Sequence, residues 1–255
     1  MKGDGRPIKR LRHLAGRAIC KYGLIEDGDR LAVGVSGGKD SLVLIKYLAE
    51  LRARAPVKFE LGVIHLEPAP AAPGLSPEAL AEALGRMRAW LAELPLDFLH
   101  LEPAPEVPEL AAWRPGDPSP CWNCARLRRK RLFDLCREQR ANRLALGHHL
   151  DDAIETLLMN IFHSGRLEGL AANQILFEGR LNIIRPLMLT PEDLVRNLAL
   201  EQGLPVLPRT CPADGRTTRQ TVKELVASLV QGNPKIRGNL AAVAEAAGLG
   251  RQAGA

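Results

Sequence analysis

Short apolar runs alternate with longer amphipathic stretches along most of the chain. A short apolar run bounded by turn residues is typical of a buried strand, and apolar positions spaced three and four apart indicate a helix. The predicted strands are residues 31–35, 59–66, 97–101, 143–146 and 182–184. The predicted helices are residues 7–22, 40–54, 77–93, 124–140, 153–162 and 191–202, with two short helices after residue 220. Because strands and helices alternate, we predict a doubly wound α/β fold with a mostly parallel sheet.

The same pattern divides the chain into three parts. Residues 1–25 form a basic N-terminal helix, residues 26–205 a nucleotide-binding domain, and residues 206–255 a helical C-terminal extension. The boundary before the extension lies near residues 203–212, where a glycine and several prolines interrupt the pattern. A chain of 255 residues is long enough to bury the core of one such domain with its extensions.

The composition limits the class of protein. Apolar residues make up 46% of the chain and charged residues 25%, which is the balance of a globular protein. No apolar run approaches the roughly 18–20 residues that a membrane span needs. The basic N-terminus also lacks the apolar core of a secretory signal. We therefore expect a cytoplasmic protein without a membrane partner.

Positive charge is concentrated in two places. The net charge is +6 and the isoelectric point about 9.3. The first cluster is Lys9, Arg10, Arg12, Arg17 and Lys21. The second cluster is Arg126, Arg128, Arg129, Lys130 and Arg131. Two basic clusters in one chain favour a nucleic-acid substrate.

Residues 36–41, with the sequence Ser-Gly-Gly-Lys-Asp-Ser, connect the first predicted strand to its helix. Backbone N–H groups converge in such a glycine turn, the helix N-terminus is electropositive, and Lys39 adds a positive charge. The common phosphate loop has the form Gly-x-x-x-x-Gly-Lys-Ser/Thr. Here Val33 occupies the position of its first glycine, and Asp40 follows the lysine. The segment therefore predicts a phosphate site of a different kind.

The chain contains five cysteines: Cys20, Cys121, Cys124, Cys136 and Cys211. An odd number in a cytoplasmic chain argues against a disulfide framework. Cys20 and Cys136 lie among apolar neighbours in predicted helices, which favours a place in the core. Cys121 and Cys124 form a C-x-x-C pair, which suits a redox dithiol, half of a zinc site, or an iron–sulfur cluster with Cys211 as third ligand. Spacing alone does not decide among these sites.

The loop at residues 36–41 resembles the pyrophosphate loop of the N-type ATP pyrophosphatases, which cleave ATP between its α- and β-phosphates. Over residues 9–230 the chain is similar to the tRNA 2-thiocytidine synthetases of that superfamily. The similarity is carried by the loop, by Cys-x-x-Cys-x-Arg-Leu-Arg-Arg at 121–129, by Gly-His-His-x-Asp-Asp at 147–152, and by Ile-Arg-Pro-Leu at 184–187. The sequence around Cys211 and the segment 67–74 depart from the pattern of that family.

The resemblance implies a fold of the PP-loop type and a defined reaction. The C2 oxygen of cytidine 32 in tRNA is adenylated and then replaced by sulfur, which gives 2-thiocytidine. ATP, Mg²⁺ and a [4Fe–4S] cluster are the implied cofactors. The implied cluster ligands are Cys121, Cys124 and Cys211, which leave one iron without a protein ligand. The implied partners are the tRNA anticodon loop, a cysteine desulfurase as sulfur donor, and a second copy of the chain in a homodimer.

The resemblance also assigns residues around the nucleotide. The residues implied to bind it are Ser36, Gly37, Gly38, Lys39, Asp40, Ser41, His65, Gly147, His148 and Asp152. Lys39, Asp40 and Asp152 are the implied catalytic residues, and the two carboxylates are candidates to hold Mg²⁺. Structural roles are also open for two neighbours: Asp151 is a candidate helix cap, and Arg185 a candidate for an ion pair at the edge of the core.

Other functions stay open on the sequence alone. A relative that thiolates uridine or ribothymidine in tRNA would use the same loop. Another adenylating synthetase of the superfamily would need no set of three cysteines. A zinc-stabilised RNA-binding module would keep the loop only as a vestige, and the intact residues 36–41 argue against it.

Overall fold

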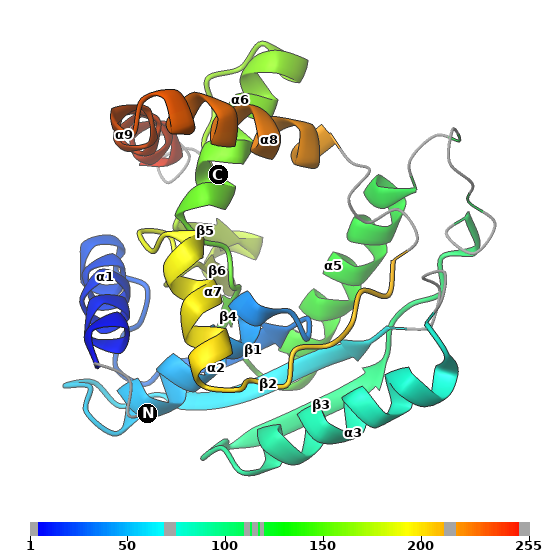
Figure 1. The fold of residues 1–255 in the computed structure, drawn as a ribbon. Coiled ribbons are helices and arrows are strands. Elements are labelled where there is room, and N and C mark those ends of the chain that lie inside the picture. The colour runs from blue at the N-terminus through cyan, green and yellow to red at the C-terminus, as the bar shows by residue number, and fades with distance from the viewer. Residues whose placement is uncertain are drawn as a thin grey trace.

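The computed structural model describes residues 5–68, 75–109, 113, 117, 120–211 and 218–249. In these residues six strands form one sheet in the order β3-β2-β1-β4-β6-β5 (Figure 1). β5 is antiparallel to β6, and the other neighbouring strands are parallel. The strand order leaves β1 in both directions, which confirms the predicted doubly wound α/β fold.

The strands are short and the helices that connect them are longer. The strands are β1 (Arg30–Val35), β2 (Glu60–Glu67), β3 (Phe98–Pro103), β4 (Arg143–Ala145), β5 (Asn173–Leu176) and β6 (Leu181–Ile184). The helices are α1 (Arg6–Tyr22), α2 (Lys39–Arg52), α3 (Pro77–Ala92), α5 (Cys121–Glu138), α6 (Leu150–Ser164), α7 (Glu192–Glu201), α8 (Thr218–Gly232) and α9 (Lys235–Leu249). Among the described residues, no helix is both long enough and apolar enough to cross a membrane.

α5 and α6 each begin three residues earlier than predicted. α5 begins at Cys121 rather than at residue 124, directly after a proline-rich stretch that conceals its start. The N–H of Cys124 donates to the carbonyl of Pro120 at 3.1 Å, so the first turn is already closed. α6 begins at Leu150 rather than at residue 153 because His149 caps it. Histidine is not among the residues that mark a helix start in a sequence.

The sequence prediction misses β5. This edge strand is joined to β6 by the short 3₁₀ turn η1 (Phe177–Gly179). Phe177 and Glu178 adopt φ values of 52° and 58°, which residues other than glycine rarely do. The strand itself is only half-buried and begins with two amides, so it shows no apolar run. Neither the strand nor the turn before Gly179 therefore gives a signal in the sequence.

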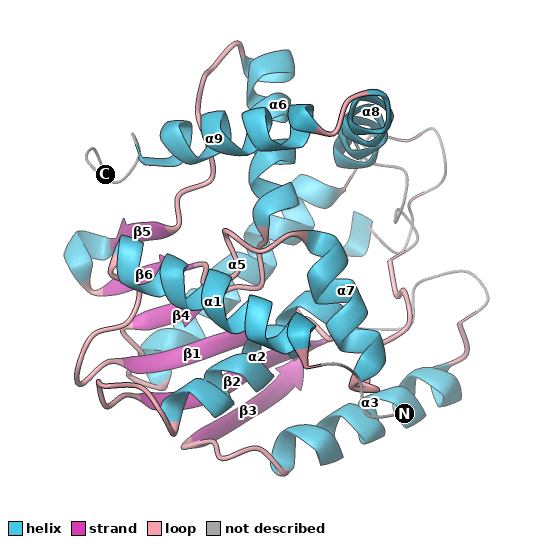
Figure 2. Cartoon of the chain, turned by 60° about the vertical axis from the view of Figure 1, so that its left-hand side comes forward, coloured by secondary structure: helices cyan, strands magenta, loops and turns pink. Residues whose placement is uncertain are grey.

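Alternate residues of the central strands face two separate cores. Val33 and Val63 belong to the larger core, which also contains the buried faces of α1, α2, α3, α6 and α7. Ala32 and Ile64 belong to the smaller core beneath α5. Figure 2 shows α1 and α7 in front of the sheet and α5 behind it. Both faces of the sheet are thus covered, as a parallel sheet requires.

The two cysteines predicted to lie in the core behave differently. Cys136 is buried in the smaller core, as predicted, and burial raises the pKa of its thiol to about 12. The prediction for Cys20 is wrong, because this side chain is exposed. α1 packs through Leu11, Ala15 and Ala18, and Cys20 lies about 200° further round the helix than Ala18.

The C-terminal helices α8 and α9 pack against α6 (Figure 1). Each is longer than the short helices predicted after residue 220, and α8 already begins at Thr218. The division of the chain into three parts at residues 25 and 205 stays a prediction. The contacts show that the extension is built onto the α/β domain.

A buried ionic network ties the amino ends of the central strands together. Asp29 and Arg143 are only 4% and 6% exposed, and the guanidinium Nε donates to the carboxylate at 3.0 Å. Asp29 also accepts hydrogen bonds from the backbone N–H of Glu26 and from the side chain of Asn142, both at 2.7 Å. Every oxygen of this buried carboxylate therefore has a donor.

Replacing Asp29 with alanine is expected to destabilise the protein by about 3 kcal/mol, because the buried Arg143 then keeps only the exposed carboxylate of Glu26, at 2.9 Å, as a counter-charge. Urea unfolding followed by circular dichroism measures this loss. Glu82→Ala is the control, since Glu82 pairs with Arg86 on the surface of α3 and its loss is expected to change stability by less than about 0.5 kcal/mol. Equal stabilities of the two variants would contradict the role given to Asp29.

Candidate active site

The turn between β1 and α2 depends on a glycine in a left-handed conformation. Gly37 has a φ of +82°, and its carbonyl accepts a hydrogen bond from the N–H of Leu207 at 2.9 Å. A Cβ atom at this position would lie 2.3 Å from Cδ1 of Leu207. Both the backbone conformation and the close neighbour therefore exclude a side chain here.

Two serine hydroxyls hold the turn in shape. The N–H of Ser36 donates to Oγ of Ser41 at 3.2 Å, and the N–H of Gly38 donates to Oγ of Ser36 at 3.3 Å. The Ser41 hydroxyl donates to the carbonyl of Gly38 at 2.9 Å. α2 has no side-chain cap, so the N–H groups of its first turn lack intrahelical partners. These groups form a site for an anion, as the sequence predicts.

Lys39 is held by two carboxylates. Its Nζ lies 3.1 Å from Oε1 of Glu192 and 3.2 Å from Oδ2 of Asp40. Burial alone would lower the pKa of Lys39, but the charge of Asp40 and the contacts with Glu192 raise it. Burial alone would raise the pKa of Glu192, but hydrogen bonds from Lys223 and Lys39 lower it to about 2. The loop therefore carries a fixed cation at neutral pH.

The carboxylate of Asp40 has one oxygen left over. Oδ2 contacts Lys39, whereas Oδ1 is buried and has no hydrogen-bond partner. Nε2 of His149 lies 3.8 Å from Oδ1. A buried acceptor without a donor is rare in a folded protein. A carboxylate oxygen beside a phosphate loop is the ligand that Mg²⁺ prefers, so Asp40 fits this ion.

The turn after β4 lies directly against the loop. A Cβ atom on Gly147 would lie 2.9 Å from the backbone carbon of Asp40 and 2.9 Å from the nitrogen of Ser41. Only glycine allows the two backbones to approach this closely. The Gly-His-His-x-Asp-Asp segment and the glycine loop, far apart in the sequence, are thus brought to the same edge of the sheet.

The two histidines of this segment have separate tasks. His149 is buried and caps α6: its Nδ1 accepts from the N–H of Asp152 at 3.3 Å, and Asp152 accepts from the N–H of His149 at 2.9 Å. His148 accepts from Nε of Arg185 at 3.2 Å, which leaves its proton on Nε2. Burial and the charge of Arg185 lower the pKa of His148 to about 4. His148 is therefore a neutral donor at pH 7.

Asp152, predicted to hold Mg²⁺, already has partners for both oxygens. One oxygen accepts the capping hydrogen bond, and the other accepts from Arg219 at 3.1 Å. Its role as a metal ligand stays a prediction. Arg185 is buried and donates to the carbonyl of Ala171 at 2.6 Å, besides its contact with His148. It therefore orients a histidine of the site.

His65 lies at the carboxyl end of β2, opposite Val35 in the register of the sheet. Its ring is fully buried, and its Nδ1–H donates to the carbonyl of Val35 at 2.6 Å. Burial lowers the pKa of this histidine, and Nε2 is buried without a partner. The neutral ring therefore fixes the end of β1 from which the glycine loop departs. Contact with a nucleotide stays a prediction for His65.

The cysteine pair opens α5. Cys121 and Cys124 lie one turn apart at the N-terminus of this helix, and both are half-buried. Cys211 is also half-buried and ends the segment after α7, which in Figure 1 rises toward the end of α5 that carries the pair. Within the described residues, no three or more Cys, His, Asp or Glu side chains are arranged to hold a metal ion. The donors suit an iron–sulfur cluster, and Cys211 as the third ligand stays a prediction.

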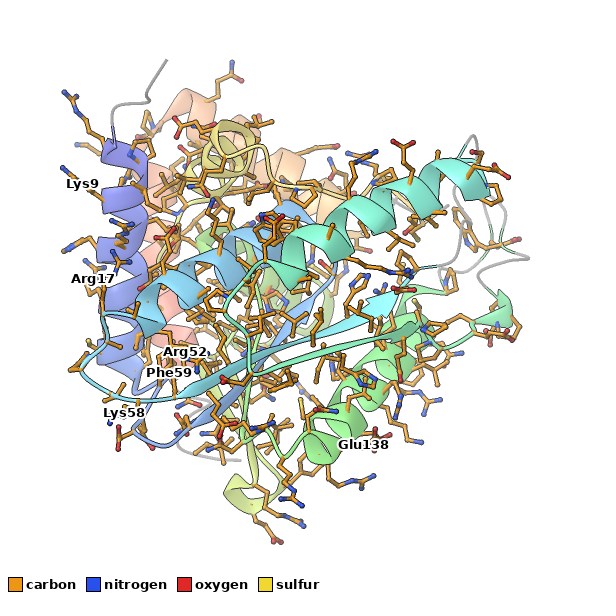
Figure 3. All side chains as sticks on the ribbon, turned by 90° about the horizontal axis from the view of Figure 1, so that it is seen from below. Lys9, Arg17, Arg52, Lys58, Phe59 and Glu138 are labelled. Carbon is orange, nitrogen blue, oxygen red and sulfur yellow. The ribbon has the colours of Figure 1, made fainter. Side chains whose placement is uncertain are left out.

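The two basic clusters lie on opposite sides of the molecule. α1 and α5 flank the sheet at its two sides in Figure 1. Lys9 and Arg17 point away from α1 into solvent (Figure 3). Only the cluster on α5 adjoins the cysteine pair. The sequence therefore predicts the two concentrations of positive charge, but it does not show that they lie on separate surfaces.

A set of ion pairs connects the C-terminal helices to the site and gives no signal in the sequence. The pairs are Arg219 with Asp152 (3.1 Å), Lys223 with Glu192 (2.7 Å) and Arg237 with Asp151 (2.6 Å). Glu192 also donates its backbone N–H to Asp151 at 2.7 Å, so Asp151 caps α7 rather than its own helix. The partners are separated by dozens of residues in the sequence, and charged residues on helix surfaces are too common to reveal them.

Comparison with known proteins gives consistent results. The profile of the family described as PP-loop domain matches residues 9–227. The tRNA-cytidine(32) 2-sulfurtransferase of Syntrophotalea carbinolica is 38% identical over 93% of this chain and 88% of its own length. The enzyme of the same name from Geotalea daltonii is 39% identical over 91% of this chain and 89% of its own.

A solved structure shares the fold. The U34-tRNA thiolase NcsA from Methanococcus maripaludis, described with its [4Fe-4S] cluster, superposes with a TM-score of 0.71 at 22% identity, covering 93% of this chain and 77% of that one. The fold and the glycine loop agree with the family matches, which cover nearly the whole length of the chain. The chain therefore belongs to the tRNA-cytidine(32) 2-sulfurtransferase family of PP-loop proteins.

Proposed function

We propose that this protein is an ATP-dependent tRNA sulfurtransferase that replaces the C2 oxygen of cytidine 32 with sulfur. The observation that carries the proposal is the loop at residues 36–41, where free amides, a fixed Lys39 and an unpartnered oxygen of Asp40 meet. It is supported by membership of a family whose curated members bear the name of this activity.

The loop residues act on the leaving group. A pyrimidine C2 oxygen leaves poorly, and transfer of AMP to it creates a good leaving group while pyrophosphate departs from ATP. The amides of the first turn of α2 and the ammonium of Lys39 stabilise the negative charge on that pyrophosphate. Asp40 would hold Mg²⁺ through its unpartnered oxygen, and the ion would supply further charge neutralisation.

Residues at the neighbouring strand ends orient the nucleotide. Gly147 lets the turn after β4 pack against the glycine loop, and His148 offers its Nε2–H as a donor. His65 anchors the start of the loop from β2. This arrangement follows the rule that ligands of open α/β sheets bind beyond the carboxyl ends of the strands.

Cys121, Cys124 and Cys211 are the proposed ligands of a [4Fe–4S] cluster, whose chemistry would supply the sulfur transfer. The first two are already one turn apart on α5. Cysteine thiolates are the usual ligands of such clusters. A cysteine desulfurase is the proposed source of the sulfur, the anticodon loop of tRNA the substrate, and the cytoplasm the compartment. A homodimer and the three-part division of the chain belong to the same proposal.

Mass spectrometry of tRNA nucleosides tests the proposed function. Cells without this protein are compared with the same cells after the gene is restored, and 2-thiocytidine is expected to vanish and return. Loss of a thiouridine instead would transfer the mechanism to another base. Unchanged thionucleosides would exclude a sulfurtransferase and favour a synthetase that does not thiolate.

The salt bridge to Lys39 is expected to matter for ATP. Replacing Glu192 with glutamine leaves the ammoniums of Lys39 and Lys223 facing each other without a carboxylate between them, so Lys39 moves out of place. We expect the KM for ATP to rise about 10-fold, the effect of losing a charge-assisted hydrogen bond. Steady-state kinetics with tRNA in excess measure it.

Two further variants control this experiment. Lys223→Met in the Glu192→Gln background removes the repulsion and is expected to restore part of the affinity for ATP. Glu201→Gln changes an exposed carboxylate on the same helix and is expected to leave the KM unchanged. A normal KM in the Glu192→Gln variant would refute the role given to this carboxylate.

The cysteine assignment makes a separate prediction. Alanine at Cys121, Cys124 or Cys211 is expected to abolish thiolation and iron binding, with ATP binding kept, because the loop lies on another element. Iron content and visible absorption of anaerobically purified protein measure the cluster. Cys20→Ala and Cys136→Ala are the controls and are expected to retain it. A Cys211→Ala variant with an intact cluster and full activity would show that Cys211 is not a ligand.

A further inference from the structure

Trp122 is an aromatic side chain in an unusual place. It lies in the first turn of α5, between the two cysteines, and 75% of its surface is exposed. Soluble proteins bury most of the area of a tryptophan ring, so an exposed ring next to a candidate site favours a role in binding a partner. The neighbouring side chains indicate the kind of partner.

An arginine covers part of this ring. The guanidinium carbon of Arg126 lies 5.4 Å from the ring centroid of Trp122, a cation–π contact one turn further along α5. Arg126 is steadied by a hydrogen bond to Oδ1 of Asn123 at 3.4 Å. Asn123 in turn donates to Glu109 at 3.1 Å. The ring is therefore positioned against a cation rather than left to rotate freely.

The exposed cations of α5 continue from the ring in one row. Arg126, Arg129 and Lys130 follow Trp122 at spacings of four, seven and eight residues, which places all four on one face of the helix. We call these four residues the Trp122 stripe. It extends about 12 Å along the axis, at 1.5 Å per residue.

Ion pairs are distributed unevenly along α5. Among the described residues, the three cations of the Trp122 stripe make no ion pair with a carboxylate. Toward the other end of α5, Arg131 pairs with Glu102 at 2.6 Å and with Glu138 at 2.9 Å, and Arg137 pairs with Asp134 at 3.3 Å. In the described part of the chain, the cations of the Trp122 stripe are thus left without carboxylate partners, and they lie between residues 126 and 130, toward the end of α5 that carries the cysteines.

We propose that the Trp122 stripe binds single-stranded RNA, with an unpaired nucleobase stacked on the open face of Trp122 and phosphates bound by Arg126, Arg129 and Lys130. Stacking on an aromatic ring beside arginines is how proteins hold unstacked bases, and a row of unpaired cations suits a phosphate backbone. An acidic protein would satisfy the cations but would not need the flat ring. The inference rests on the proposed function, because it assigns the tRNA substrate its place beside the cysteine pair.

The test separates stacking from charge. Dissociation constants of the anaerobically purified protein for an anticodon stem-loop RNA are measured by fluorescence anisotropy at several salt concentrations. Trp122→Ala is expected to weaken binding about 10-fold or more without changing the dependence on salt. Arg129→Ala and Lys130→Ala are each expected to lower the slope of log K against log salt by about 0.7. Trp122→Phe, which keeps a ring, is expected to retain most of the affinity.

Leu200→Ala is the matched control, because Leu200 is also 75% exposed but lies on α7, and RNA affinity is expected to stay unchanged. Wild-type affinity in Trp122→Ala would overturn the proposal. So would normal RNA affinity combined with loss of binding to a cysteine desulfurase, which would make the stripe a protein interface. If wild-type protein forms no 2-thiocytidine while Trp122→Ala still loses RNA affinity, the proposed function fails and the RNA surface stands.

Discussion

The site depends on how closely the turn after β4 approaches the first turn of α2. Gly147 lies against the backbone of Asp40 and Ser41 at a distance that no side chain permits. This contact fixes the glycine loop from one side, and the hydrogen bond from Leu207 to Gly37 fixes it from the other. The first turn of α2 is therefore held from two sides by backbone, which changes shape less than side chains do.

Beside this turn, acidic and basic side chains alternate in a row. Lys39 stands between Asp40 and Glu192, and Glu192 stands between Lys39 and Lys223. The contacts with Asp40 and Glu192 raise the pKa of Lys39 and hold its ammonium in one position. A cation that is already placed loses little entropy when a phosphate arrives, which favours stabilisation of a leaving group over simple binding.

The sequence predicts the fold and the glycine loop well because both depend on neighbouring residues. Strand, turn and helix signals are contiguous at residues 31–54, and the strands next to β1 are true apolar runs. Glu192 is not predictable in this way, since it meets Lys39 across 153 positions of sequence. The sequence does not predict β5, because this half-exposed edge strand has no apolar run and the left-handed conformation of Phe177 gives no sequence signal. Cys211 has a side chain of the right kind for a cluster ligand, but only the tertiary structure decides which cysteine sulfur atoms lie close together.

The ion pairs from α8 and α9 to α6 and α7 limit how the C-terminal helices can be exchanged. Asp151, Asp152 and Glu192 are half-buried carboxylates, and each has an arginine or lysine from the C-terminal helices as its partner. Without those helices, Asp151 and Asp152 would lose their arginine partners and Glu192 would keep only Lys39. The acidic positions of the domain and the basic positions of the extension therefore depend on one another, so exchanging α8 and α9 for other helices would also require changing the charges around the glycine loop.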